Sequence, residues 1–181
     1  MTLKSLRLCI IITLALLTPA LTTFANSNTT VDSLPEYSQK YDPARNAFAD
    51  GRQAINLAKQ SNRRVLIIVG GDWCQWCRAM DKFIKTTPSV YKNLHKHFVI
   101  LKINVSDKNK NKKFLSAFPK AHGYPHLFVA NHNGSVLRSQ ATNILQENGK
   151  YSEKRFLEFI SRWKQKASSP DFAQRTPGKK E

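Results

Sequence analysis

The chain has 181 residues and a formal net charge of +17, from 29 basic and 12 acidic side chains. This length allows one domain to bury a hydrophobic core without disulfides, and three cysteines are too few for a disulfide-rich scaffold. The lysine-rich segments lack interleaved aromatic residues, which argues against a nucleic-acid surface and leaves solubility, an anionic surface or an acidic partner to explain the charge.

The first 25 residues have the pattern of a secretory signal peptide. Lys4 and Arg7 precede an apolar stretch over 8–17, and small residues lead up to Ala25. The apolar stretch is shorter than the roughly 20 residues that a membrane-spanning helix needs, which disfavours the alternative of an uncleaved anchor. We therefore expect cleavage after Ala25 and a periplasmic location.

Cysteine usage agrees with an exported protein. Cleavage of the signal peptide removes Cys9 and leaves Cys74 and Cys77 in the mature chain. A structural framework in an oxidising compartment would bring more pairs, and no odd thiol remains. The two remaining cysteines therefore indicate a functional pair.

The mature chain divides into three parts. Residues 26–45 are polar and contain two prolines, which predicts a linker. Residues 46–166 have the periodic apolar patterns of a folded domain. Residues 167–181 hold two prolines and a glycine but few apolar side chains, so we expect a disordered basic tail.

Within the domain, expected helices and strands alternate as in a layered α/β fold. Periodicity, β-branched runs and turn residues predict a helix over 46–60, a strand over 65–69, a helix from Cys74, a short helix after Thr87, a strand over 98–105, a short helix ending near Phe118, a hairpin of strands over 126–130 and 135–139, an irregular loop over 141–150, and a final helix carrying Phe156, Phe159, Ile160 and Trp163. Helices connect the first two strands, so we expect these strands to be parallel.

The stretch over 65–80 contains the residues to which we assign the chemistry. Its apolar strand ends at Gly70 and Gly71, which predict a turn, and Cys74 stands where the next helix begins. The unpaired N–H groups and the dipole at that end of a helix stabilise a thiolate over a thiol. Cys77 is one helical turn further on, placed to attack a mixed disulfide formed on Cys74.

The segment Gly-Asp-Trp-Cys-Gln-Trp-Cys-Arg at 71–78 resembles the active site of the thioredoxin superfamily, with a Trp before the first cysteine and a basic residue after the second. Leu-Lys-Ile-Asn-Val at 101–105 resembles the next strand of that family, and Gly-Tyr-Pro-His at 123–126 resembles its cis-proline loop. The resemblance covers residues 46–166. It implies a thioredoxin-like α/β fold, with a mixed sheet of about four strands and helices on both faces.

The resemblance also implies roles for single residues. The two cysteines would be catalytic, Pro125 would be cis and shape the substrate groove, and Tyr124 would contact the substrate chain in the manner of a strand. The alternative for Pro125 is an ordinary proline at the first residue of a strand. Trp73 and Trp76 would form an apolar platform around the first cysteine, or else belong to the core.

Thioredoxins carry a buried acid six residues before the first cysteine, and this chain has Ile68 there. The proton of Cys77 must then leave by another route, such as water or Lys102, which matches a lysine of the family. His126 follows the cis-proline candidate and is placed to tune Cys74 as the pH falls below neutral. The alternative is a solvated histidine.

These features predict a thiol–disulfide oxidoreductase that acts on exported proteins and needs no cofactor. Neither Gln75 nor Trp76 brings a charge that would strongly stabilise the reduced form, to which strong oxidants owe their potential. We therefore expect a reductase or isomerase rather than an oxidase. A reductase needs an electron supply, which implies a redox partner in the membrane.

Two alternatives use the same domain differently. Two thiolates suit Cu(I), which would make the chain a periplasmic copper-binding or metal-delivery module. A non-catalytic assembly factor would not depend on Cys74. A structural zinc site is disfavoured, because His95 and His97 lack the spacing of a Cys₂His₂ site.

Overall fold

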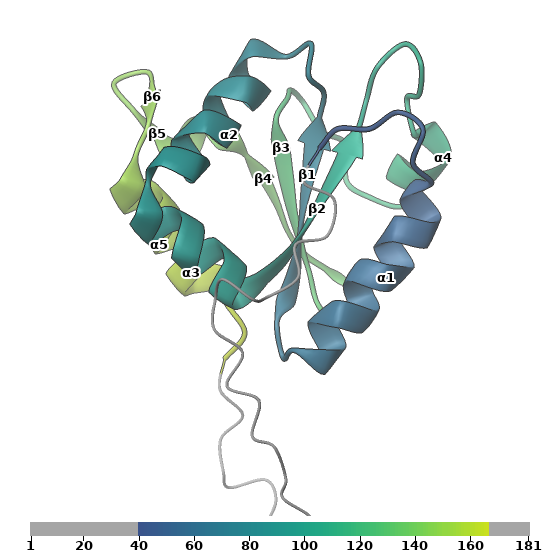
Figure 1. Cartoon of the computed structure of the whole chain (residues 1–181), viewed down its shortest axis with the longest axis horizontal. Helices are drawn as coiled ribbons and strands as arrows, with labels where there is room; N and C mark the ends of the chain where they lie inside the picture. Colours follow the sequence, from purple (N-terminus) through teal and green to yellow (C-terminus); the bar gives the residue numbers. More distant parts are fainter. Residues whose placement is uncertain (1–39, 167–181) are drawn as a thin grey trace, which may run out of the picture.

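The computed structural model describes residues 40–166 of the chain (Figure 1). The predicted signal peptide over 1–25, most of the predicted linker over 26–45 and the predicted tail over 167–181 lie outside the described residues. Between residues 40 and 166, no helix is long and apolar enough to cross a membrane.

Four strands form a mixed sheet in the order β2-β1-β3-β4 (Figure 1). Their bounds are β1 Arg64–Gly70, β2 Phe98–Asn104, β3 His126–Ala130 and β4 Val136–Ala141. β1 and β2 are parallel, as predicted from the helices that connect them, whereas β3 is antiparallel to both of its neighbours. β1 and β2 are buried along almost their whole length, which explains their nearly continuous apolar sequences.

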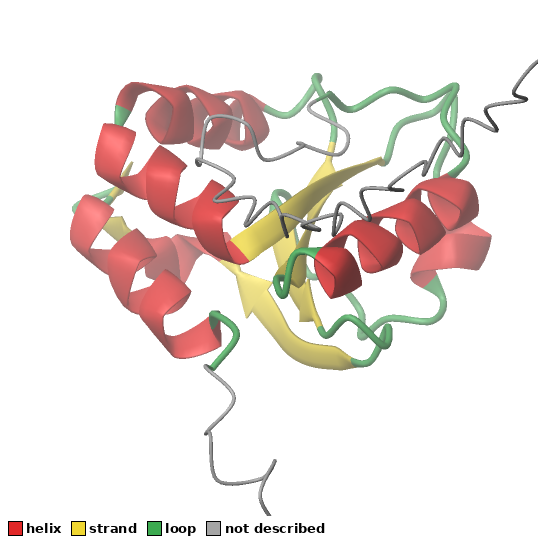
Figure 2. Cartoon of the chain, turned by 60° about the horizontal axis from the view of Figure 1, so that its bottom comes forward, coloured by secondary structure: helices red, strands yellow, loops and turns green. Residues whose placement is uncertain are grey.

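Helices cover both faces of this sheet (Figure 2). The helices are α1 Ala47–Gln60 and α4 Lys112–Leu115 on one face, and α2 Gln75–Thr86, α3 Pro88–His97 and α5 Glu153–Trp163 on the other. Alternate side chains of a strand enter the two cores, so Leu66 and Ile68 pack with the second group of helices while Val65 and Ile67 pack with the first. The predicted fold class is confirmed.

The prediction of an irregular loop over 141–150 is wrong. A short 3₁₀ helix, η2 (Thr142–Leu145), leads into a hairpin of β5 (Gln146–Glu147) and β6 (Lys150–Tyr151). Asn148 and Gly149 form its turn with φ angles of 51° and 71°, the conformation that an Asn-Gly pair favours in a two-residue hairpin loop. Two-residue strands are too short to give an alternating pattern in the sequence.

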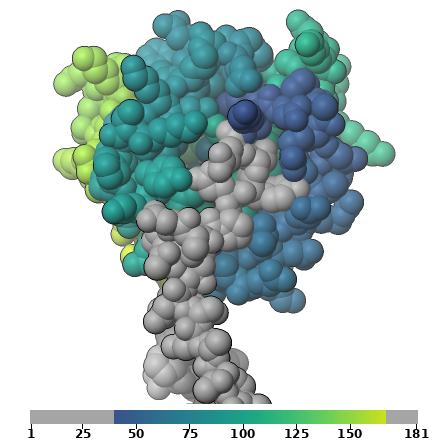
Figure 3. Space-filling view, in the orientation of Figure 1, coloured from purple at the N-terminus to yellow at the C-terminus, as the bar shows by residue number. Residues whose placement is uncertain are grey.

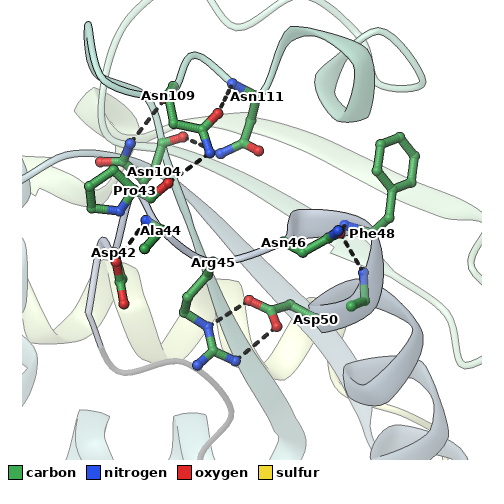
Figure 4. A network of polar contacts seen from close by, with 11 residues as sticks. Asp42, Pro43, Ala44, Arg45, Asn46, Phe48, Asp50, Asn104, Asn109 and Asn111 are labelled. Atoms are coloured by element: carbon green, nitrogen blue, oxygen red, sulfur yellow. Dashed lines mark hydrogen bonds and ion pairs between the residues drawn. The ribbon is translucent and has the colours of Figure 1, made fainter.

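The prediction of a linker is wrong for its last residues, which pack onto the domain (Figure 4). Tyr41 is 3% exposed and belongs to the core between the sheet and α2. Arg45 donates two hydrogen bonds, of 2.7 and 2.8 Å, to the carboxylate of Asp50, and Asn109 Nδ2 donates to the Pro43 carbonyl oxygen at 2.9 Å. Figures 1 and 3 show this segment, in purple, beside the start of α1. One buried aromatic in a polar stretch leaves no periodic signal.

Asn46 caps α1, since its side-chain oxygen accepts hydrogen bonds from the N–H of Phe48 at 3.0 Å and of Ala49 at 3.1 Å (Figure 4). Loss of such a cap costs about 1 kcal/mol. We expect Asn46→Ala to lower the free energy of unfolding by that amount, measured by urea denaturation. Thr87→Ala is the control, because Thr87 occupies the N-cap of α3 without a side-chain cap hydrogen bond. Equal losses in the two variants would contradict the assignment.

Candidate active site

Cys74 lies at the N-cap of α2, as the sequence predicts. Its backbone is extended, with φ −83° and ψ 117°, and its Sγ accepts a hydrogen bond from the N–H of Cys77 at 3.3 Å. Its own N–H donates to the Gly71 carbonyl oxygen at 3.0 Å. The sulfur thus takes the place that a Ser or Asp oxygen has in ordinary caps, and is held at the start of the helix.

The two sulfurs differ in their access to solvent. Both cysteines are free thiols, and Cys74 is 7% exposed whereas Cys77 is 0% exposed. Burial first, and then the neighbouring Cys74, raise the pKa of Cys77 to about 12. A substrate therefore meets the sulfur of Cys74 before that of Cys77.

The loop before β3 lies against Cys74. The Tyr124–Pro125 peptide bond is cis, and Cys74 Sγ lies 3.5 Å from the Tyr124 carbonyl oxygen. The Pro125 carbonyl oxygen accepts a hydrogen bond from Thr142 Oγ1 at 2.9 Å, which ties the loop to η2. A cavity of about 470 Å³ opens beside it, and its lining includes Trp76, Tyr124, Pro125, His126, Thr142 and Asn143. The loop that lies against Cys74 therefore also lines a groove.

Trp73 and Trp76 flank Cys74 at the surface, with exposures of 59% and 48%. The Trp73 indole N–H donates to the Val105 carbonyl oxygen at 2.6 Å, and its ring meets Tyr124 edge to face at a centroid distance of 6.0 Å. Trp76 meets Tyr151 in the same way at 6.3 Å. The alternative that these tryptophans belong to the core is wrong, because both are exposed.

Lys102 and His126 are both buried polar residues of the sheet. Lys102, the β2 partner of Ile68, places its Nζ 2.6 Å from Asp81 Oδ2 on α2. His126 Nε2 lies 2.8 Å from Ser139 Oγ on β4, and burial, together with the nearby His122, lowers its pKa. The alternative of a solvated His126 is therefore wrong.

Tyr41 and Asp81 also belong to the site, although the sequence does not predict them. The Tyr41 hydroxyl oxygen lies 3.1 Å, and Cys77 Sγ 2.5 Å, from the point that a Cβ on Gly70 would occupy, so the phenol and the buried thiol converge there. Burial first, then Cys77 and Asp81, raise the pKa of Tyr41 well above its usual value. Asp81 could have been identified from the sequence, because it follows Cys77 by four residues and shares its helix face. No sequence pattern identifies Tyr41.

The cysteines and two histidines of α3 are the candidate metal ligands. Among residues 40–166, no group of three or more His, Cys, Asp or Glu side chains lies close enough to hold a metal ion. His95 Nδ1 lies 2.8 Å from the Tyr91 carbonyl oxygen within α3. The two thiols are the soft ligands that the copper alternative would use.

Comparison with known proteins identifies similar sequences and folds. A family model described as thioredoxin-like matches residues 46–131. A disulphide isomerase from Xylella fastidiosa Temecula1 superposes with a TM-score of 0.58 at 27% identity, over 67% of this chain and 94% of its own. The oxidised C-terminal domain of Neisseria meningitidis DsbD superposes with a TM-score of 0.51 at 18% identity, over 66% and 97% of the two chains, a likeness of fold alone. Curated proteins give no match.

The site and the fold together define a class. A mixed four-stranded sheet carries a Trp-Cys-x-x-Cys segment at a helix N-terminus, opposite a cis-proline loop, and the matched region contains both. This is a thioredoxin-like α/β protein. Its sequence and fold are similar to those of the thioredoxin superfamily.

Proposed function

We propose that the chain is a thiol–disulfide oxidoreductase of exported proteins, in which Cys74 attacks and Cys77 resolves. The position of Cys74 Sγ carries this proposal. The sulfur lies at a helix N-cap, at the surface end of the pair, and 3.5 Å from the Tyr124 carbonyl oxygen at the edge of a groove. A substrate chain seated along Tyr124 and Pro125 would bring its own sulfur to Cys74.

In the reducing direction, the Cys74 thiolate attacks a substrate disulfide. A Cys74–substrate disulfide forms, the substrate S–S bond breaks, and one substrate sulfur leaves as a thiolate that takes up a proton. Cys77 then loses its proton and attacks Cys74 Sγ, and the second substrate sulfur leaves in the same way. The dithiol is oxidised by two electrons and the substrate is reduced by two.

We assign the reducing or isomerising direction to this site. Gln75 and Trp76, which separate the cysteines, are uncharged, so they add little to the stability of the reduced form. The name of the 27% identical Xylella protein, a disulphide isomerase, supports the same direction. The signal-peptide pattern over 1–25 supports a periplasmic location, where a membrane redox partner would return the pair to its dithiol form.

A second cavity, of about 480 Å³, is also lined by Tyr124, and its lining supports the proposal that the substrates are acidic. Its apolar lining includes Leu115, Phe118 and Phe128, and its basic lining is Lys110, Lys112 and Lys120. The lysines are exposed and their charge attracts carboxylates. We therefore place an acidic and apolar segment of the substrate here, next to the cysteine that reacts with Cys74.

Trapping tests the proposal. Without Cys77 the mixed disulfide has no internal resolving thiol, so Cys77→Ala expressed in a bacterial periplasm should accumulate covalent adducts with exported proteins. After acid quenching and thiol blocking, the adducts are separated on a non-reducing gel and identified by mass spectrometry. The trapped cysteines should have acidic neighbours.

The matched control is the double variant Cys74→Ser/Cys77→Ala, which keeps the fold but lacks the attacking sulfur. It should form no adducts. If Cys77→Ala forms no adduct that dithiothreitol releases, the proposed mechanism is wrong. Adducts whose trapped cysteines lack acidic neighbours would contradict only the assignment of the lysine-lined cavity.

A further inference from the structure

The resolving step needs a thiolate at Cys77, but the buried surroundings of this residue disfavour the charged form. Cys77 must lose its proton before it attacks Cys74 Sγ, yet it is 0% exposed and packed in the core with Ile68 and Met80. An apolar surrounding stabilises the thiol against the charged thiolate. A hydrogen-bond donor beside the sulfur would offset part of this cost.

Tyr41 has its hydroxyl at that place. The hydroxyl oxygen and Cys77 Sγ converge on the space left open by the missing side chain of Gly70, at 3.1 and 2.5 Å from the Cβ that any other residue would add. Within the part of the chain that the structure describes, the buried Tyr41 hydroxyl has no hydrogen bond to an oxygen or nitrogen atom. Buried hydroxyls without a partner are rare. The Tyr41 hydroxyl is therefore available to donate a hydrogen bond to the sulfur.

The surroundings of Tyr41 keep it a donor. Lys102 Nζ lies 5.0 Å from the centre of its ring and 2.6 Å from Asp81 Oδ2, so a charge pair flanks the phenol. Burial, Cys77 and Asp81 raise the pKa of Tyr41, and the phenol therefore stays protonated across the physiological range.

We infer that the Tyr41 hydroxyl donates a hydrogen bond to Cys77 Sγ as its thiolate forms, and so accelerates the resolving step. The inference rests on the proposed exchange function. In this step the Cys77–Cys74 bond forms and the Cys74–substrate bond breaks. The proton lost by Cys77 balances the one taken up by the departing substrate thiolate, while Tyr41 keeps its own proton. Tyr41 lies in residues 40–45, which precede the region that resembles thioredoxins, and this segment thus adds a residue to the site.

The chromogenic disulfide 5,5′-dithiobis(2-nitrobenzoate) separates the two steps in one absorbance trace. Attack by Cys74 releases one nitrothiolate at a rate proportional to reagent concentration. Attack by Cys77 then releases the second at a rate independent of reagent concentration. We expect Tyr41→Phe, which removes only the hydroxyl, to leave the first phase unchanged and to slow the second by about tenfold at pH 7.

The pH profile distinguishes a chemical role from a structural one. Tyr41 and Tyr151 are the titratable side chains that interact with the two sulfurs, and Asp81 and Lys102 flank Tyr41. Tyr41→Phe leaves the other three in place. The second-phase rate should therefore rise with pH in both proteins, with the profile of the variant displaced to higher pH, while the first-phase profile stays the same. Tyr91→Phe is the matched control, because Tyr91 packs against the same core cluster, and it should change neither phase.

Two results would overturn the inference: an unchanged second phase in Tyr41→Phe, or equal slowing of both phases at every pH. Failure of the proposed function looks different. Wild-type protein would then give no second phase, because no Cys74–Cys77 disulfide would form.

Discussion

Reduced protein treated briefly with iodoacetamide at pH 8 should be alkylated at Cys74 while Cys77 stays unmodified. Only the thiolate reacts, and burial raises the pKa of Cys77 to about 12. Against a free cysteine of pKa about 8.5, this lowers the thiolate population about 10³-fold. The buried position of Cys77, which is 0% exposed against 7% for Cys74, slows the reaction further. Peptide mass spectrometry after a timed quench gives the label on each residue.

Two samples calibrate the labelling. Protein unfolded in urea should be labelled at both cysteines, because unfolding removes the burial that protects Cys77. Native Cys74→Ser should remain almost unlabelled. Comparable labelling of both cysteines in the native wild type would mean that Cys77 is accessible. It would contradict the assignment of Cys74 as the attacking thiol and Cys77 as the resolving thiol.

The sequence was sufficient where short-range patterns decide the structure. The apolar run of β1, the helix that begins at Cys74 and the parallel β2 all follow from periodicity and turn residues. The groove required the family resemblance in addition, because Tyr124 lies fifty residues from Cys74 and meets it only through the pairing of β3 with β1.

Long-range contacts account for what the sequence did not reveal. The sequence offers Lys102 as a proton route for Cys77, but the ion pair of Lys102 with Asp81 depends on how α2 packs over β2. Tyr41 lies in a stretch whose polar composition predicts a linker, and its burial depends on an open space above Gly70 that no local pattern encodes. Residues that tune a buried thiol are found by packing rather than by motif.

Gly70 illustrates the same point. The sequence predicts a turn at Gly70 and Gly71, but the positive-φ glycines of the described chain are Gly134 and Gly149. Gly70 continues β1, where it pairs with Asn104. What it provides is space, because a Cβ would lie 2.5 Å from Cys77 Sγ and 3.1 Å from the Tyr41 hydroxyl.

We therefore expect Gly70→Ala to lower the free energy of unfolding by about 1–3 kcal/mol, the usual cost of overpacking a core. The new methyl group must displace either Cys77, which is fixed within α2, or Tyr41, which is fixed in the core cluster. Urea denaturation measures the loss. The displacement should also separate the phenol from the thiol and slow the second nitrothiolate phase.

Gly123→Ala is the matched control for this prediction. Nothing lies within 4 Å of a Cβ at Gly123, and its φ is outside the left-handed region, so the methyl group meets neither atoms nor strain. Restricting the unfolded chain at such a position stabilises a protein by about 0.4–1 kcal/mol. Opposite signs in the two variants would assign the Gly70 effect to the crowded space beside Cys77. Equal stability of the two would mean that Cys77 and Tyr41 can move apart freely, and the close approach of phenol and thiol would then not be a constraint of the fold.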